Sequence, residues 1–169
     1  RCEDTDRDGT CAPDDCDDTN ADAWPGAPEV VGDGVDQDCD GAEICYVDAD
    51  GDGYTDGVST VVSADTDCTD AGEGAASDPT GECDDADATI HPGALETVGD
   101  EVDSDCDDEE LCYVDADGDG FVDGTTTVVS LDTDCADAGE GTSSNPSGEC
   151  DDTDASVYPG APEGVGDGV

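Results

Sequence analysis

Carboxylate side chains alternate with other residues in short loops that recur along this chain. The clearest loop is DADGDG, at residues 48–53 and again at 115–120, and the related DTDRDG occupies residues 4–9. Each loop has oxygen-bearing side chains at positions 1, 3 and 5 and glycine at position 6, the spacing by which a short loop wraps a calcium ion. The pattern predicts metal-binding loops at these segments.

The residues that follow each loop predict the remaining ligands. Position 7 offers a backbone carbonyl and position 9 an aspartate, whereas position 12 is Ser59 or Thr126 in the two DADGDG loops, so a further ligand must come from elsewhere in the chain. In the first loop, Asp15 fills position 12. The predicted ligands are Asp4, Asp6, Asp8 and Asp15; Asp48, Asp50, Asp52, Tyr54 and Asp56; and Asp115, Asp117, Asp119, Phe121 and Asp123.

A second kind of loop has oxygen-bearing side chains at positions 1, 3 and 5 and glutamate at position 12. It lacks glycine at position 6, and we expect the Pro-Gly turn that follows to supply the bend. Its predicted ligands are Asp18, Asn20, Asp22 and Glu29; Asp85, Asp87, Thr89 and Glu96; and Asp152, Asp154, Ser156 and Glu163. Two further sets are expected to complete neighbouring sites as bridging carboxylates: Asp36, Asp38 and Asp40, and Asp103, Asp105 and Asp107.

The charge balance requires a partner outside the polypeptide. The chain has 51 acidic residues against 2 basic ones, a net charge of -49. Two carboxylates ~4 Å apart repel by about 1 kcal/mol in water and about 4 kcal/mol at an effective dielectric of 20, so clustering them without a cation opposes folding. Oxygen ligands in this number favour calcium over copper, zinc or magnesium. We expect several calcium ions per chain, and the charge argues against nucleic acid as a partner.

An internal repeat of 67 residues organises the chain. YVDADGDG begins at Tyr46 and again at Tyr113, and the Pro-Gly-Ala turns follow the same spacing. We predict a partial, divergent repeat at residues 1–44, a complete repeat at 45–111 and an incomplete one at 112–169. Acidic, glycine-rich sequence is also typical of disorder, but random acidity would not keep its register over 67 residues. Repeat chains contact mainly their sequence neighbours, which favours an elongated array that continues in a longer chain or a homopolymer.

The predicted fold class is mostly irregular and small-β: elongated tandem calcium-loop repeats with short β-hairpins, stapled by disulfides and with little hydrophobic core. The chain contains one Trp, one Phe and no Met, too few large apolar residues for a domain-sized core. Residues 44–47 and 59–63, and their repeats 111–114 and 126–130, are β-branched or aromatic and are expected to pair as hairpins. The Gly- and Ser-rich stretches 70–81 and 137–148 are expected to be flexible surface excursions.

The 11 cysteines indicate an oxidising compartment. Spacing leaves two pairing schemes open. One joins cysteines 23 residues apart and leaves Cys150 unpaired: Cys16–Cys39, Cys45–Cys68, Cys83–Cys106 and Cys112–Cys135, with Cys2–Cys11 closing a small loop. The other joins sequence neighbours: Cys39–Cys45, Cys68–Cys83, Cys106–Cys112 and Cys135–Cys150.

The strings YVDADGDGY, GECDDADATIHPGALE, DCDDTNADAWPGAPE and DGVDQDCDG resemble the acidic "putative metal-binding motif" repeats of secreted bacterial surface proteins. The DTDRDGTC segment resembles thrombospondin type 3 calcium repeats. These resemblances imply an extracellular or cell-surface location and a calcium-dependent structural or adhesive role, with the ligands at the Asp and Glu positions named above.

The sequence favours a structural protein over an enzyme. His91 is the single histidine, and at position 7 of its loop it is expected to contribute a backbone carbonyl. Trp24, His91 and Tyr158 share one repeat position before Pro-Gly and are expected to pack over that turn, with a shared docking surface as the alternative.

We predict an extracellular calcium-binding structural repeat protein, part of a surface filament or of a long adhesin or stalk. The alternatives are a calcium-dependent binding module for a protein or glycan partner, and a metal-sequestering protein. No membrane span is expected, and Cys150 is expected to form a disulfide with Cys2 or Cys11 of a neighbouring subunit or segment.

Overall fold

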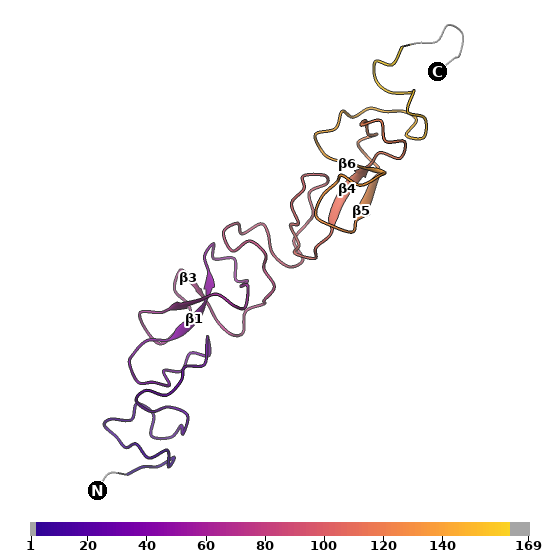
Figure 1. The fold of residues 1–169 in the computed structure, drawn as a ribbon. Helices are drawn as coiled ribbons and strands as arrows, with labels where there is room; N and C mark the ends of the chain where they lie inside the picture. Colours follow the sequence, from indigo (N-terminus) through magenta and orange to yellow (C-terminus); the bar gives the residue numbers. More distant parts are fainter. Residues whose placement is uncertain (1–2, 163–169) are drawn as a thin grey trace. The chain divides into compact units, whose positions relative to one another are not determined.

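The computed structural model describes residues 3–162 of a chain that divides into two compact units, Arg1–His91 and Pro92–Val169. Each unit contains one small three-stranded sheet, and loops and turns make up the rest (Figure 1). Within residues 3–162 there is no helix, and hence none that could cross a lipid bilayer.

The sheet of the first unit is built around β1 (Ile44–Asp48). Its neighbours β2 (Thr60–Val62) and β3 (Gly72–Gly74) both run antiparallel to it, in the order β2-β1-β3. The β-branched and aromatic residues of these segments favour the extended backbone. The hairpin expected from residues 44–47 and 59–63 is confirmed.

The second unit repeats this arrangement. The central strand β4 (Glu110–Val114) lies between β5 (Thr127–Ser130) and β6 (Glu140–Gly141), again with antiparallel pairing. The hairpin expected from residues 111–114 and 126–130 is therefore also confirmed.

The expectation that 70–81 and 137–148 are flexible excursions was wrong, because each stretch supplies the third strand of a sheet. No β-branched residue marks Gly72–Gly74 as a strand; its glycines instead permit a close approach. A Cβ on Gly74 would lie 2.5 Å from Thr55 Cγ2, and one on Gly141 would lie 2.7 Å from Val122 Cγ1. The third strand therefore forms here because glycine leaves room for the neighbouring side chain, and not because its residues have a high intrinsic β-propensity.

The interior is small, and its buried side chains are mainly cysteines and acidic residues with few apolar side chains. Cys45 and Cys112, in the central strands, are fully buried, and Val122 is the one large apolar side chain buried to the same degree among the described residues. Glu43 and Glu110 are buried equally deeply. The prediction of a disulfide-stapled fold with little hydrophobic core is confirmed.

The disulfides follow the scheme of 23-residue spacing, and the scheme of sequence neighbours was wrong. The bonds Cys16–Cys39, Cys45–Cys68 and Cys112–Cys135 are formed. Cys11, Cys83 and Cys106 are also disulfide-bonded, Cys150 is an exposed free thiol, and Cys2 lies outside the described residues. Closing a loop of this size stabilises the fold by roughly 3 kcal/mol in the chain-entropy model.

Candidate metal centres

The acidic side chains gather in two kinds of cluster. The loop clusters are each formed by a DxDxDG-type loop with one later acidic residue: Asp4, Asp6, Asp8 and Asp15; Asp48, Asp50, Asp52 and Glu82; and Asp115, Asp117, Asp119 and Glu149. The glutamate clusters are Glu29, Asp36, Asp38 and Glu43, and Glu96, Asp103, Asp105 and Glu110.

Backbone amides shape each loop cluster. In the second, Asp48 Oδ1 accepts a hydrogen bond from the Gly51 amide at 2.7 Å, and its Oδ2 accepts one from the Gly53 amide at 3.2 Å. Both glycines have positive φ, 80° and 88°, which a residue with a Cβ adopts only with strain. The loop thereby curls around its first carboxylate and brings one oxygen from each of Asp48, Asp50 and Asp52 within 4.8 Å of one another.

The second and third aspartates of each loop use one oxygen and leave the other without a partner. Asp50 Oδ1 accepts from the Asp52 amide at 3.2 Å and Asp52 Oδ1 from the Tyr54 amide at 2.8 Å, while their Oδ2 atoms are buried without a hydrogen bond. The same holds for Asp6 and Asp8 and for Asp117 and Asp119. A buried carboxylate oxygen without a partner is unfavourable, and a cation would satisfy it.

Glu82 and Glu149 lie near the aspartates of the two DADGDG loops and are candidates for the ligand that these loops lack at position 12. Each is only 6% exposed, and both carboxylate oxygens of each are buried without a hydrogen-bond partner. Burial, followed by the charges of Asp52 and Asp50, raises the pKa of Glu82 to about 7. Burial and the corresponding aspartates of its own loop raise the pKa of Glu149 to about 7 as well. The negative charges of Glu82 and Glu149 are therefore unfavourable next to the loop aspartates, and a cation shared between each glutamate and its loop would stabilise them.

Sequence reasoning missed Glu82 and Glu149, although a signal was present. Asp15, Glu82 and Glu149 occupy the same repeat position, each directly before the cysteine of an acidic-Cys-Asp-Asp string. Asp15 was predicted as a ligand from its distance to the first loop. The repeat register alone could have transferred that role to the other two.

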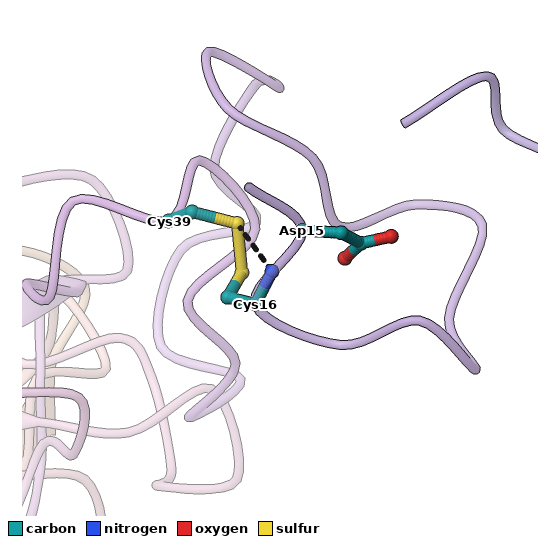
Figure 2. A group of neighbouring side chains, drawn as sticks. All are labelled: Asp15, Cys16 and Cys39. Atoms are coloured by element: carbon teal, nitrogen blue, oxygen red, sulfur yellow. Dashed lines mark hydrogen bonds between the residues drawn. A yellow bond between two sulfur atoms is a disulfide. The ribbon is translucent and has the colours of Figure 1, made fainter. Parts of the chain in front are cut away.

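Asp15 also illustrates how a disulfide anchors this position. Its Oδ1 accepts from the Asp17 amide at 2.9 Å and its Oδ2 is buried without a partner. In Figure 2 the carboxyl group projects away from the neighbouring Cys16–Cys39 disulfide. Because both sulfur atoms are bound to each other, Cys16 and Cys39 have no thiolate to offer a metal, and the carboxylate is the available donor.

The first aspartate of each Glu-ended loop belongs with the preceding loop cluster. The Thr5 amide donates to Asp18 Oδ1 at 3.1 Å, and the repeat equivalents are the Ala49 amide to Asp85 at 2.8 Å and the Ala116 amide to Asp152 at 3.0 Å. Each donor lies between the first two aspartates of a DxDxDG-type loop. Asp18, Asp85 and Asp152 therefore hold that loop in place.

The middle positions of the Glu-ended loops form local turns instead of converging. Asn20 Oδ1 accepts from the Asp22 amide at 3.2 Å. The hydroxyls of Thr89 and Ser156 donate to Asp87 and Asp154, and these hydrogen bonds lower the pKa of both carboxyls. Glu163 lies outside the described residues.

Glu29 and Glu96 lie with the aspartates that follow them. Glu29 Oε1 accepts from the Asp38 amide at 2.7 Å, and Glu96 Oε1 from the Asp105 amide at 2.9 Å, while the Oε2 atom of each glutamate is buried without a partner. Burial, then nearby aspartate charges, raises the pKa of both glutamates. Asp40 and Asp107 lie beside these clusters and accept from the amides of Ala42 and Glu109, both at 2.9 Å.

Asp56 and Asp123, at position 9, close the end of their own loops. Asp56 accepts hydrogen bonds from Ser59, and Asp123 accepts them from the amide and hydroxyl of Thr126. The Thr126 hydroxyl, followed by the backbone amides, lowers the pKa of Asp123 to about 2.

The aromatic residues at position 7 pack on the residue before the Pro-Gly turn. The rings of Tyr54 and His91 stack with centroids 4.6 Å apart, and those of Phe121 and Tyr158 stack at 5.0 Å. His91 and Tyr158 therefore pack against an aromatic ring of the preceding DADGDG loop. The first loop has Thr10 at position 7, and Trp24 lines a pocket with both apolar neighbours, such as Val30 and Val35, and polar ones, such as Gln37.

Comparison with known proteins identifies the motif. A family described as "Putative metal-binding motif", whose short name refers to copper, matches the chain at residues 15–43, 83–110 and 150–169. The first match begins at Asp15 and the second at Cys83, directly after Glu82. Each extends through a glutamate cluster. The family thus matches three segments of the chain, of which the third is shorter, and this confirms the resemblance to "putative metal-binding motif" repeats. No curated protein and no solved structure matches the chain.

Proposed function

We propose that this chain is an extracellular calcium-binding structural repeat protein, rather than an enzyme, whose loops are held in place by bound calcium. The observation that carries the proposal is the set of buried carboxylate oxygens without hydrogen-bond partners that each loop cluster gathers around one point. A bound divalent cation turns this mutual repulsion into attraction and completes the fold.

The donor set favours calcium over copper. The clusters offer carboxylate oxygens, which hard cations prefer, whereas copper favours imidazole and sulfur. The cysteines of the described residues are disulfide-bonded except Cys150, and the ring of His91 is stacked on Tyr54. Calcium also accepts six to eight oxygens in flexible geometry, which suits clusters of four carboxylates better than the strict octahedron of magnesium.

A structural role follows from what the metal would connect. Glu82 lies 30 residues beyond Asp52 in the loop that it faces, so a cation shared between them closes a long segment of chain. In a protein with few buried apolar side chains, that closure replaces a core. Disulfides support an extracellular location, and the repeat supports membership of a filament, adhesin or stalk. The exposed thiol of Cys150 supports a covalent link to a neighbouring subunit.

The test is thermal unfolding of chelator-treated protein after addition of calcium, magnesium or copper, followed by circular dichroism. We expect micromolar to millimolar calcium to raise the midpoint and magnesium to do so less. Sodium chloride at matched ionic strength controls for simple charge screening. A calcium effect no larger than that of the salt control would refute the proposal, and a larger effect of copper would replace calcium with copper.

A further inference from the structure

Two deeply buried glutamates have no role in the loop clusters. Glu43 and Glu110 are each 1% exposed and head the fully buried side chains by volume. They occupy the same position in successive repeats, directly before or at the start of the central strands β1 and β4. A carboxylate buried this completely is unfavourable unless something pairs with it.

The protein groups around these glutamates do not satisfy them. Glu43 Oε1 accepts from the Ile44 amide at 3.1 Å, but its Oε2 is buried without a hydrogen bond. Both carboxylate oxygens of Glu110 are buried without a hydrogen bond of good geometry, and the nearby Gly99 and Leu111 amides oppose only part of the rise in its pKa. The charged neighbours are themselves acidic: Glu29 and Asp33 for Glu43, and Glu96 and Asp100 for Glu110. The missing partner must therefore carry positive charge or donate protons.

The same arrangement of carboxylates surrounds a pocket in each unit. Glu43 lines a pocket of about 110 Å³ together with Glu29 and Asp38. Glu110 lines a pocket of about 160 Å³ with their repeat equivalents, Glu96 and Asp105. One carboxylate oxygen from each of Glu29, Asp36 and Asp38 lies within 4.8 Å of the others, and the second cluster meets the same limit.

We propose that Glu43 and Glu110 complete a second kind of metal site, in which each glutamate cluster binds one hard divalent cation such as calcium. The site differs from the loop clusters in its acidic residues: two glutamates, Glu29 and Glu43 or Glu96 and Glu110, join the aspartates of residues 36–41 or 103–108, whereas each loop cluster has one later acidic residue. The inference rests on the proposed function for the nature of the ion.

The central strands then connect the two kinds of site. Glu43 precedes β1 and Asp48 ends it, while Glu110 begins β4 and Asp115 follows it. Each strand is held at one end by a glutamate cluster and at the other by a loop cluster. This placement gives a strand of only five residues two ionic anchors in addition to its disulfide.

The test counts bound calcium ions by native mass spectrometry for the wild type and for Glu43→Gln, Glu110→Gln and Glu82→Gln. Each substitution is expected to remove one ion, and Glu43→Gln with Glu110→Gln together should remove two. Glu101→Gln, which changes an exposed carboxylate of the second unit, should leave the count unchanged.

The outcomes separate this inference from the proposed function. A wild type that binds no calcium would refute both. If Glu82→Gln loses an ion while Glu43→Gln and Glu110→Gln keep the wild-type count, calcium binding stands and the second kind of site is refuted. Should Glu43→Gln lose the native disulfide pattern, Glu43→Asp decides: calorimetry should show at least tenfold weaker binding of one ion, and unchanged affinity overturns the inference.

Discussion

Replacing Glu82 by glutamine should change the stability of the protein in opposite directions with and without calcium. In the metal-free fold the pKa of Glu82 is raised from 4.5 to about 7 by burial and by the loop aspartates. This shift corresponds to about 3 kcal/mol at 1.36 kcal/mol per unit, which solvent screening reduces to about 1 to 2 kcal/mol. The folded state binds the proton more tightly than the unfolded state, so stability falls as pH rises from 4.5 through 7.

At pH 8 and in chelator, Glu82→Gln removes this destabilising charge, and we expect the free energy of unfolding in urea to rise by about 1 to 2 kcal/mol. In saturating calcium the same substitution removes an anionic ligand. If it weakens binding at that loop about 100-fold, the variant loses about 2.7 kcal/mol relative to the wild type. At pH 4 in chelator the two proteins should unfold nearly alike, because Glu82 is then largely protonated in both the folded and the unfolded state.

The control is Asp70→Asn, which neutralises an exposed carboxylate of the same unit. It should shift stability slightly and in the same direction with and without calcium, through net charge alone. If Glu82→Gln behaves like this control, Glu82 does not share a cation with the loop, and the second loop cluster as described is refuted.

Three further perturbations test other features of the fold. Thr126→Val should raise the pKa of Asp123 from about 2 toward its usual 3.8, which carbon-detected NMR titration of the carboxyl would reveal; an unchanged pKa would mean that the hydroxyl is not its main partner. Gly74→Ala places a methyl group 2.5 Å from the buried Thr55 side chain and should lower the free energy of unfolding by about 1 to 3 kcal/mol, as measured in urea; no loss would show that β3 is not packed there. Oxidised protein should form a covalent dimer on non-reducing electrophoresis, because the exposed thiol of Cys150 can form one disulfide with a second copy; Cys150→Ser should abolish the dimer, and a discrete monomer from the wild type would argue against a covalent link.

Features that depend on local chemistry could be predicted from the sequence. The DxDxDG-type loops follow from aspartate oxygens that bind amides two to five residues ahead and from glycines that accept positive φ. The β1–β2 and β4–β5 hairpins follow from β-branched segments, and the 23-residue cysteine spacing is the one that formed.

Features that depend on competition between neighbouring polar groups were harder to predict. The spacing of the Glu-ended loops suggested that Asp87 and Glu96 face one ion. In the structure, Asp87 accepts a hydrogen bond from the hydroxyl of Thr89, only two residues away. Glu96 accepts one from the amide of Asp105, nine residues later. The spacing of the ligands does not show which carboxylate will instead accept a hydrogen bond from a nearby hydroxyl group.

The two oxygens of each loop carboxylate have different partners, and this explains how so acidic a chain can fold. One oxygen of Asp50 or Asp52 binds a backbone amide nearby, which fixes the turn without any ion, and the other is left buried for a cation. The turns therefore need little beyond their own sequence, while the closure of Glu82 onto the loop needs the metal. Removing calcium should accordingly release the long-range closures first and leave the short turns and the disulfides in place, so that hydrogen exchange would accelerate around Glu82 before it does within β1.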